Sequence, residues 1–180
     1  MNPEEQARAL FPSMPDSVFK IWLAPLIDTG GWPFTHLKQS TANTGWHRLL
    51  NGVSLESIAR RVWTRQVIPC SFDAFDHSAI HTILGICAAH IPGWPTTIPY
   101  LSPDQVLNFI TILRGLKGGL ASASFQRSRA YVYEHGKLHT PAVLLQEPGG
   151  LIIMDGNHGL AAIFSLPMSE TRCIDAWIGR

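Results

Sequence analysis

The chain has 180 residues, 46% of which are hydrophobic, and it carries a formal net charge of +1. This length and apolar content predict one domain, or one domain with a helical extension, built around a substantial core. The near-neutral charge excludes a global basic field that would by itself identify a nucleic-acid-binding protein, although a local basic groove stays open.

Cysteine usage and apolar runs bear on the compartment of the protein. Cys70, Cys87 and Cys173 lie far apart and match no metal or disulfide spacing, so we expect them to be reduced and mostly buried, as in a cytoplasmic protein. The first residues are acidic, and no apolar run reaches the roughly 18 residues that a membrane span needs. We therefore expect neither a membrane span nor a conventional export signal.

The first 35 residues combine a short helix, predicted over residues 3–10, with a segment rich in aromatic side chains. The aromatic residues are Phe11, Phe19, Trp22, Trp32 and Phe34. This density argues against disorder, so we expect the segment to cover another element as ordered structure.

A helix is predicted over residues 54–63, where Ser54 is a suitable N-cap and apolar residues recur with helical spacing. The run resembles the first helix of a helix-turn-helix, but no second amphipathic helix follows in register. Two interpretations stay open: Arg60 and Arg61 read DNA, or they form the solvated basic face of an ordinary helix.

Residues 73–91 predict a further helix with an apolar stripe that includes Ile83, Leu84 and Cys87. His77 and His81 lie four residues apart on one face, a spacing at which two imidazoles can share a metal ion. No third ligand is evident, so a surface pair is the simpler interpretation.

Prolines and a glycine between residues 92 and 99 predict the main boundary of the chain. We expect a helical region over residues 1–97 that packs on a core formed by residues 98–180, with a single domain as the alternative. The core would begin with a helix over residues 102–116, which has Ser102 as its N-cap and a proline at its first position.

From residue 130 the spacing becomes strand-like. Residues 131–134 alternate, 135–137 can turn, and apolar strands follow over 142–145 and 151–154. A helix over 160–166 and a last strand over 173–178 complete the series. The predicted fold class is α/β (α+β): a small mixed sheet with a helical N-terminal half.

The loop that follows the strand at 151–154 is the strongest candidate site. It contains Asp155, Gly156, Asn157, His158 and Gly159. A strand that delivers these residues to the first turn of a helix brings free backbone amides, an imidazole and a carboxylate together. The positive end of the helix favours an anion such as phosphate, which these residues would bind.

This strand, loop and helix, with the preceding helix and the Pro-initiated apolar run at residues 141–145, resemble the ParB and sulfiredoxin superfamily. The resemblance covers about residues 100–180. It implies a core of ParB/Srx type that binds nucleotide phosphates in the loop.

The loop departs from the superfamily pattern at two positions. Asn157 stands where sulfiredoxins have their catalytic cysteine, so reductase chemistry is excluded. Gly159 stands where most members place an arginine, so another cation would have to hold phosphate. The candidates are Arg127, Arg129 and Lys137. The two arginines, two residues apart in a segment expected to be extended, would project on the same side.

A plasmid-borne subgroup, the fertility-inhibition proteins of the oncogenicity-suppression type, is similar in size and in its helical N-terminal half. Its members block the transfer of a rival plasmid or of transferred DNA through a type IV secretion channel. Membership would imply an ATPase and DNase that uses ATP and Mg²⁺ or another divalent cation. Its partners would be DNA and type IV coupling or effector proteins, in the bacterial cytoplasm near the secretion complex.

Roles follow for three side chains. Asp155 is the candidate metal ligand or water-polarising carboxylate, and His158 is the candidate proton donor or phosphate ligand. Glu134 is the candidate second carboxylate for the metal. The alternative is that Asp155 only caps the helix while the other two are solvated.

A function of another class stays open beside the enzyme. A degenerate superfamily member could bind a protein partner and no longer catalyse. Gly159 in the usual arginine position and the aromatic N-terminal segment favour this alternative.

Overall fold

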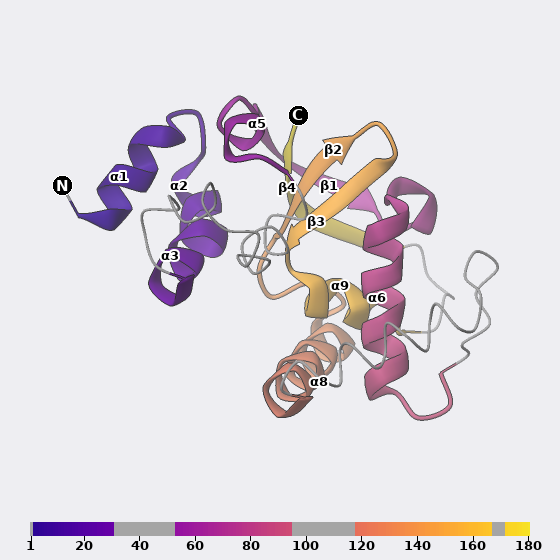
Figure 1. The fold of residues 1–180 in the computed structure, drawn as a ribbon. Coiled ribbons are helices and arrows are strands. Elements are labelled where there is room, and N and C mark those ends of the chain that lie inside the picture. Colours follow the sequence, from indigo (N-terminus) through magenta and orange to yellow (C-terminus); the bar gives the residue numbers. More distant parts are fainter. Residues whose placement is uncertain (1, 31–52, 95–117, 167–171) are drawn as a thin grey trace.

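A four-stranded mixed sheet is the centre of the fold (Figure 1). The computed structural model describes residues 2–30, 53–94, 118–166 and 172–180. The strands are β1 (Trp63–Pro69), β2 (Ala142–Glu147), β3 (Gly150–Asp155) and β4 (Cys173–Gly179), in the order β1-β4-β2-β3. β4 pairs antiparallel with β1 and parallel with β2, and β2 pairs antiparallel with β3. The predicted α/β class and three of the four strands expected in the second half, those at 142–145, 151–154 and 173–178, are confirmed.

Within the described ranges, three helices cover one face of this sheet. They are α6 (His77–His90), α8 (Gly118–His135) and α9 (Asn157–Phe164). α9 packs against both α6 and α8. The core on this face includes the fully buried side chains of Ile83, Phe125, Leu144, Leu160 and Ile174. The helix expected over residues 160–166 is confirmed, although it begins earlier, at Asn157.

Short helices from the beginning of the chain cover the other face. They are α1 (Pro3–Leu10), α2 (Asp16–Val18), the π-helical turn η1 (Phe19–Leu23), α3 (Ala24–Gly30) and α5 (Leu55–Ala59). Phe19 and Trp22 lie in a second core with Trp63 of β1. The aromatic segment therefore covers the sheet as expected over its described part, while Trp32 and Phe34 lie outside the described residues.

The two cores explain why the sequence of β3 is continuously apolar. Leu151 and Ile153 belong to the core under α6, α8 and α9, whereas Ile152 and Met154 belong to the second core. A strand that is buried on both faces needs an apolar residue at every position. The β2–β3 ladder is irregular just before Asp155, which pairs with Val143.

The first half of the chain is not wholly helical, because residues 63–69 form β1. The helix predicted over residues 54–63 is wrong in its extent: α5 ends at Ala59, and Val62 is 66% exposed. Trp63 instead pairs with Gly179 and begins a ladder with β4. This ladder satisfies the backbone groups of the segment and outweighs its helical spacing. A strand here also removes the helix-turn-helix interpretation.

α6 confirms most of the helix predicted over residues 73–91. It begins at His77 because Asp76 caps it, with the Asp76 carboxylate accepting a hydrogen bond from the Ser78 N–H at 2.8 Å. Residues before the cap form a 3-10 turn, η3 (Phe72–Ala74), and an isolated bridge from Phe75 to Leu151. The predicted stripe of Ile83, Leu84 and Cys87 is buried.

The strand predicted over residues 131–134 and the turn after it are wrong, because these residues lie in α8. Phe125 and Val132 are both buried and lie seven residues apart, which is two helical turns, whereas Tyr133 is 82% exposed. Four alternating residues are too few to distinguish a strand from the end of a helix. The packing of α8 against α9 and α6 decides the conformation.

The predicted boundary at residues 97 and 98, and the helix predicted over residues 102–116, lie outside the described residues. Elements on the two sides of that gap are nevertheless joined. β1 pairs with β4, and α6 packs on α9. Both halves of the chain therefore contribute to one sheet.

The cysteines differ in exposure, and all three carry free thiols. Cys87 is buried, Cys70 is half-buried and Cys173 is exposed. Burial raises the pKa of the Cys70 and Cys87 thiols to about 12. Among the helices in the described part of the chain, none is long and apolar enough to cross a membrane.

Candidate active site

β3 passes into α9 through a single residue, Gly156. Its backbone is left-handed, with a φ of 99°, and a Cβ atom here would lie 3.3 Å from the Cα atom of Ala142 in β2. Glycine adopts this conformation without steric strain. Asp155 therefore ends the strand while His158 lies in the first turn of the helix, and both belong to one junction.

The first turn of α9 presents backbone donors at this junction. The Leu160 N–H donates to the Gly156 carbonyl at 2.9 Å, and Gly156 has no side chain that could accept from the earlier amides. The amides of Asn157, His158 and Gly159 thus lie at the positive end of the helix. An anionic group bound there would gain both hydrogen bonds and the helix dipole.

Burial raises the pKa of the Asp155 carboxyl above its usual value, and a hydrogen bond from the Gly156 N–H partly opposes this shift. A cation beside a half-buried carboxylate relieves this cost, so Asp155 fits as one ligand of a divalent ion. Magnesium sites commonly use one or two carboxylates, with water and substrate oxygens in the other positions. The described residues hold no group of three or more His, Cys, Asp or Glu side chains able to form a metal site without substrate.

Burial lowers the pKa of His158, and electrostatic repulsion from His90 lowers it further. His158 is therefore neutral near pH 7, with one ring nitrogen free to accept a proton. His90 ends α6, and its ring stacks on that of Phe125 with centroids 5.4 Å apart. Sequence reasoning missed His90, because nothing in the chain order indicates that the end of α6 approaches the start of α9.

Of the three cations proposed to replace the missing arginine, Arg129 is the one that the structure brings toward α9. Its charge lowers the pKa of the Cys87 thiol against the larger effect of burial. The Cys87 Sγ donates to the Ala161 carbonyl at 3.3 Å, and Ala161 lies three residues after His158. The charge of Arg129 therefore acts on α6 at the point where Cys87 bonds to α9.

Arg127 and Lys137 are exposed, and neither has the setting that we expected. The segment before residue 131 is helical, not extended, so Arg127 and Arg129 are separated by roughly 200° around α8 and do not project on the same side. Lys137 follows the end of α8 instead of lying in a hairpin.

Glu134 lies in the last turn of α8 and not in a strand. Its side chain is 75% exposed, and its carboxylate is 3.6 Å from Nε2 of His135. The expected alternation with Val132 in a sheet is therefore wrong. Of the two carboxylates proposed as metal ligands, only Asp155 belongs to the junction.

His77 and His81 form the predicted pair on α6, with ring centroids 4.8 Å apart. Burial lowers the pKa of His81, and the neighbouring charge of His77 lowers it further. No third potential ligand joins them within the described ranges.

Packing accounts for the glycine at position 159. A Cβ atom there would lie 3.0 Å from Cδ2 of Leu138, closer than ordinary van der Waals contact. Leu138 is itself buried in the core. An arginine at this position would require Leu138 to shift.

No protein-family model, curated protein or solved structure matches the chain. The functional assignment therefore depends on the geometry of the junction and on the resemblance of its loop.

Proposed function

We propose that the chain is a nucleotide-hydrolysing and DNA-cleaving protein of ParB/Srx type, with its active site at the β3–α9 junction. One observation carries the proposal: Asp155 and His158 lie at one strand-to-helix turn, and burial moves their pKa values toward each other. Such paired shifts are typical of acid–base sites. Free helix-terminal amides at the same turn provide the phosphate contact.

The residues of the junction have separate roles in this proposal. The amides of Asn157, His158 and Gly159 bind phosphate oxygens, and Arg129 adds positive charge from α8. His158, neutral near pH 7, accepts a proton from the attacking water. Asp155 would hold a divalent ion such as Mg²⁺, which supplies charge neutralisation on the phosphate when bound.

The biological setting of the proposal comes from the resemblance. We propose that the protein is a fertility-inhibition factor that acts on transferred DNA near a type IV coupling complex. DNA and a coupling or effector protein would be its partners, and ATP its small substrate.

Hydrolysis of ATP and nicking of plasmid DNA, each with and without Mg²⁺, test the active site. We expect activity in the wild type and a loss of about 100-fold or more in His158→Ala, since a general base contributes roughly that factor. Asp155→Asn should lose the part of the activity that depends on Mg²⁺, because the ion would no longer be held. His77→Ala, at the other end of α6 from His90, is the matched control and should keep wild-type activity. Equal activity in all four proteins would exclude this site.

A second candidate is a partner-binding protein without catalysis, and β1 favours it. β1 is an edge strand, and Val67 on it is 70% exposed. The unpaired backbone of an edge strand is a template for addition of a partner strand, which the exposed side chain of Val67 could contact. In an assay of DNA transfer between bacteria, this candidate predicts that Val67→Asp relieves inhibition while His158→Ala does not. The enzymatic proposal predicts the reverse.

A further inference from the structure

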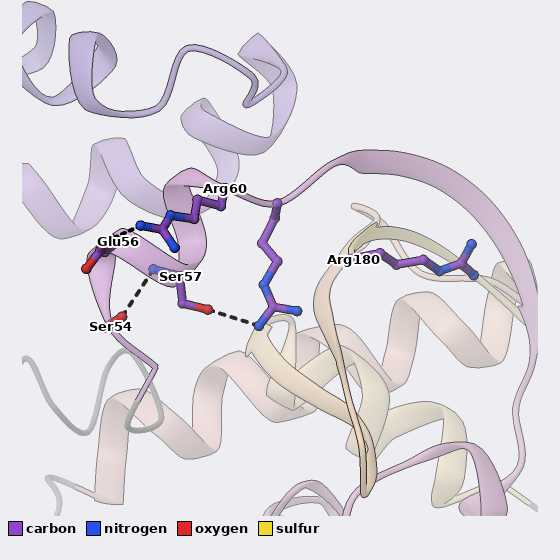
Figure 2. Close-up of a pocket in the computed structure, with 6 residues that line it drawn as sticks. Ser54, Glu56, Ser57, Arg60 and Arg180 are labelled. Carbon is purple, nitrogen blue, oxygen red and sulfur yellow. Dashed lines mark hydrogen bonds and ion pairs between the residues drawn. The ribbon is translucent and has the colours of Figure 1, made fainter.

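An open pocket of about 400 Å³ lies at the end of the sheet away from Asp155. It is lined by Ser54, Glu56, Ser57, Arg60, Arg61 and Arg180, and we call it the arginine pocket. Figure 2 shows the labelled residues of α5 and its two ends together, while Arg180, at the end of β4, points its side chain away from them.

Arg61 is the fixed group of the arginine pocket. Its Nη1 donates to the Gln146 carbonyl at 3.0 Å, and its Nη2 donates to Ser57 Oγ at 3.1 Å and pairs with Glu147 at 2.5 Å. Only 16% of the Arg61 side chain is exposed. A guanidinium that is held in this way loses little conformational entropy when it binds a ligand.

Arg60 and Arg180, by comparison, are exposed cations at the rim of the arginine pocket. Arg60 pairs with Glu56, but both side chains are about three-quarters exposed, so the pair is weak and Arg60 can change partner. The backbone of Arg180 is fixed by two hydrogen bonds with Val62, at 2.9 and 3.0 Å. Its exposed side chain turns toward Gln66, 3.2 Å away, and can rotate back toward the pocket.

The chemistry of the lining is that of a phosphate site. Three guanidinium groups line the pocket beside the hydroxyls of Ser54 and Ser57, and two carboxylates oppose them: Glu56 pairs with Arg60, and Glu147 pairs with Arg61 at the edge, so one positive charge is left. Arginine is suited to bidentate binding of phosphate oxygens. None of the six lining residues has a ring that could stack on a base. The pocket would therefore contact the phosphate of a ligand and not its base. This suits a nucleic-acid backbone better than a free nucleotide.

We propose that the arginine pocket binds a backbone phosphate of DNA. It is separate from the site at Asp155: Arg61 is anchored where Glu147 pairs with Gly150, whereas Asp155 pairs with Val143 at the other end of the β2–β3 hairpin. Five residue steps along β3 correspond to about 17 Å. The choice of DNA as ligand rests on the proposed function, and the pocket then holds the duplex while the junction cleaves it.

Binding of a fluorescent 20-base-pair duplex, measured by anisotropy in EDTA so that no metal-dependent cleavage occurs, tests the pocket. We expect Arg60→Ala and Arg180→Ala each to weaken binding at least about fivefold and to lower the slope of log K against log salt by about 0.9. Arg65→Ala is the charge-matched control, since Arg65 pairs with Asp175 outside the pocket. It should change neither quantity by more than twofold.

Competition identifies the source of the phosphate and separates this proposal from the active site. Unlabelled duplex should displace the probe from the wild type, whereas ATP and inorganic phosphate at the same phosphate concentration should not. Arg60→Ala should keep ATP hydrolysis, and His158→Ala should keep DNA binding. The proposal is overturned if both pocket variants bind DNA like Arg65→Ala, or if they lose affinity for ATP and not for DNA. Absence of hydrolysis with DNA binding still dependent on Arg60 would contradict only the proposed function.

Discussion

At the β3–α9 junction, burial shifts the pKa values of two side chains, Asp155 and His158, for the same physical reason. Loss of water disfavours charge, so the pKa of Asp155 rises and that of His158 falls, and both groups move toward their neutral forms. Gly156 makes this pairing possible, because its left-handed backbone turns the chain between them without a longer loop. A polar substrate or an ion that enters the junction would shift both groups.

The lowered pKa of His158 predicts a pH dependence of stability. The unfolded chain binds a proton near pH 6.5 while the folded junction resists it, so the free energy of unfolding should fall as the pH falls below 6.5. His90, whose pKa is lowered by burial, acts in the same direction. We expect His158→Gln to lose less stability than the wild type between pH 7.5 and 5.5 in urea unfolding. Parallel losses would show that His158 is not held neutral by the fold.

At the scale of elements, Arg61, which follows α5, hydrogen-bonds to Gln146 and Glu147 of β2. Adjacent arginines provide a matched comparison. Removing the half-buried Arg61 in Arg61→Ala should cost about 1.5–3 kcal/mol, because it breaks charged hydrogen bonds to Ser57, Gln146 and Glu147.

Arg60→Ala, which breaks only the exposed pair with Glu56, should cost at most about 0.5 kcal/mol. Urea unfolding of the two variants measures the difference. Equal costs would mean that Arg61 does not anchor the hairpin, and the fixed group of the arginine pocket would be lost with it.

Elements were predicted best where their packing surface is visible in their own sequence. β3 is apolar at every buried position, and α6 repeats its buried residues at helical spacing. α8 and β1 were misassigned because each short segment fits more than one periodicity. The conformation of each segment is decided by an element that is distant in the sequence. α8 packs on α9, and β1 pairs with β4.

For the whole molecule, the sheet joins segments from both halves of the chain. β1 from the first half is bonded to β4 from the last residues, and β4 is bonded to β2. Breaking either half therefore exposes the core of the other. The boundary predicted at residues 97 and 98 can be tested on this basis.

We expect thermal unfolding to be a single cooperative transition. Tryptophan fluorescence, to which Trp22 and Trp63 of the second core contribute among the six tryptophans of the chain, should change together with helical circular dichroism. Coincident midpoints would show that the two halves depend on each other. Two separate transitions would instead support independent domains on either side of residue 97.

Sequence alone determined the local features: the apolar strand, the glycine turn, the polar loop and the helix that together make the β3–α9 junction. These depend on neighbouring residues, and short-range sterics and periodicity are readable along a chain. Only the tertiary structure decided that α8 is a helix, that His90 comes toward the junction, and that Arg60, Arg61 and Arg180 line one pocket. These facts depend on contacts between residues far apart in sequence, and a sheet of both halves creates those contacts.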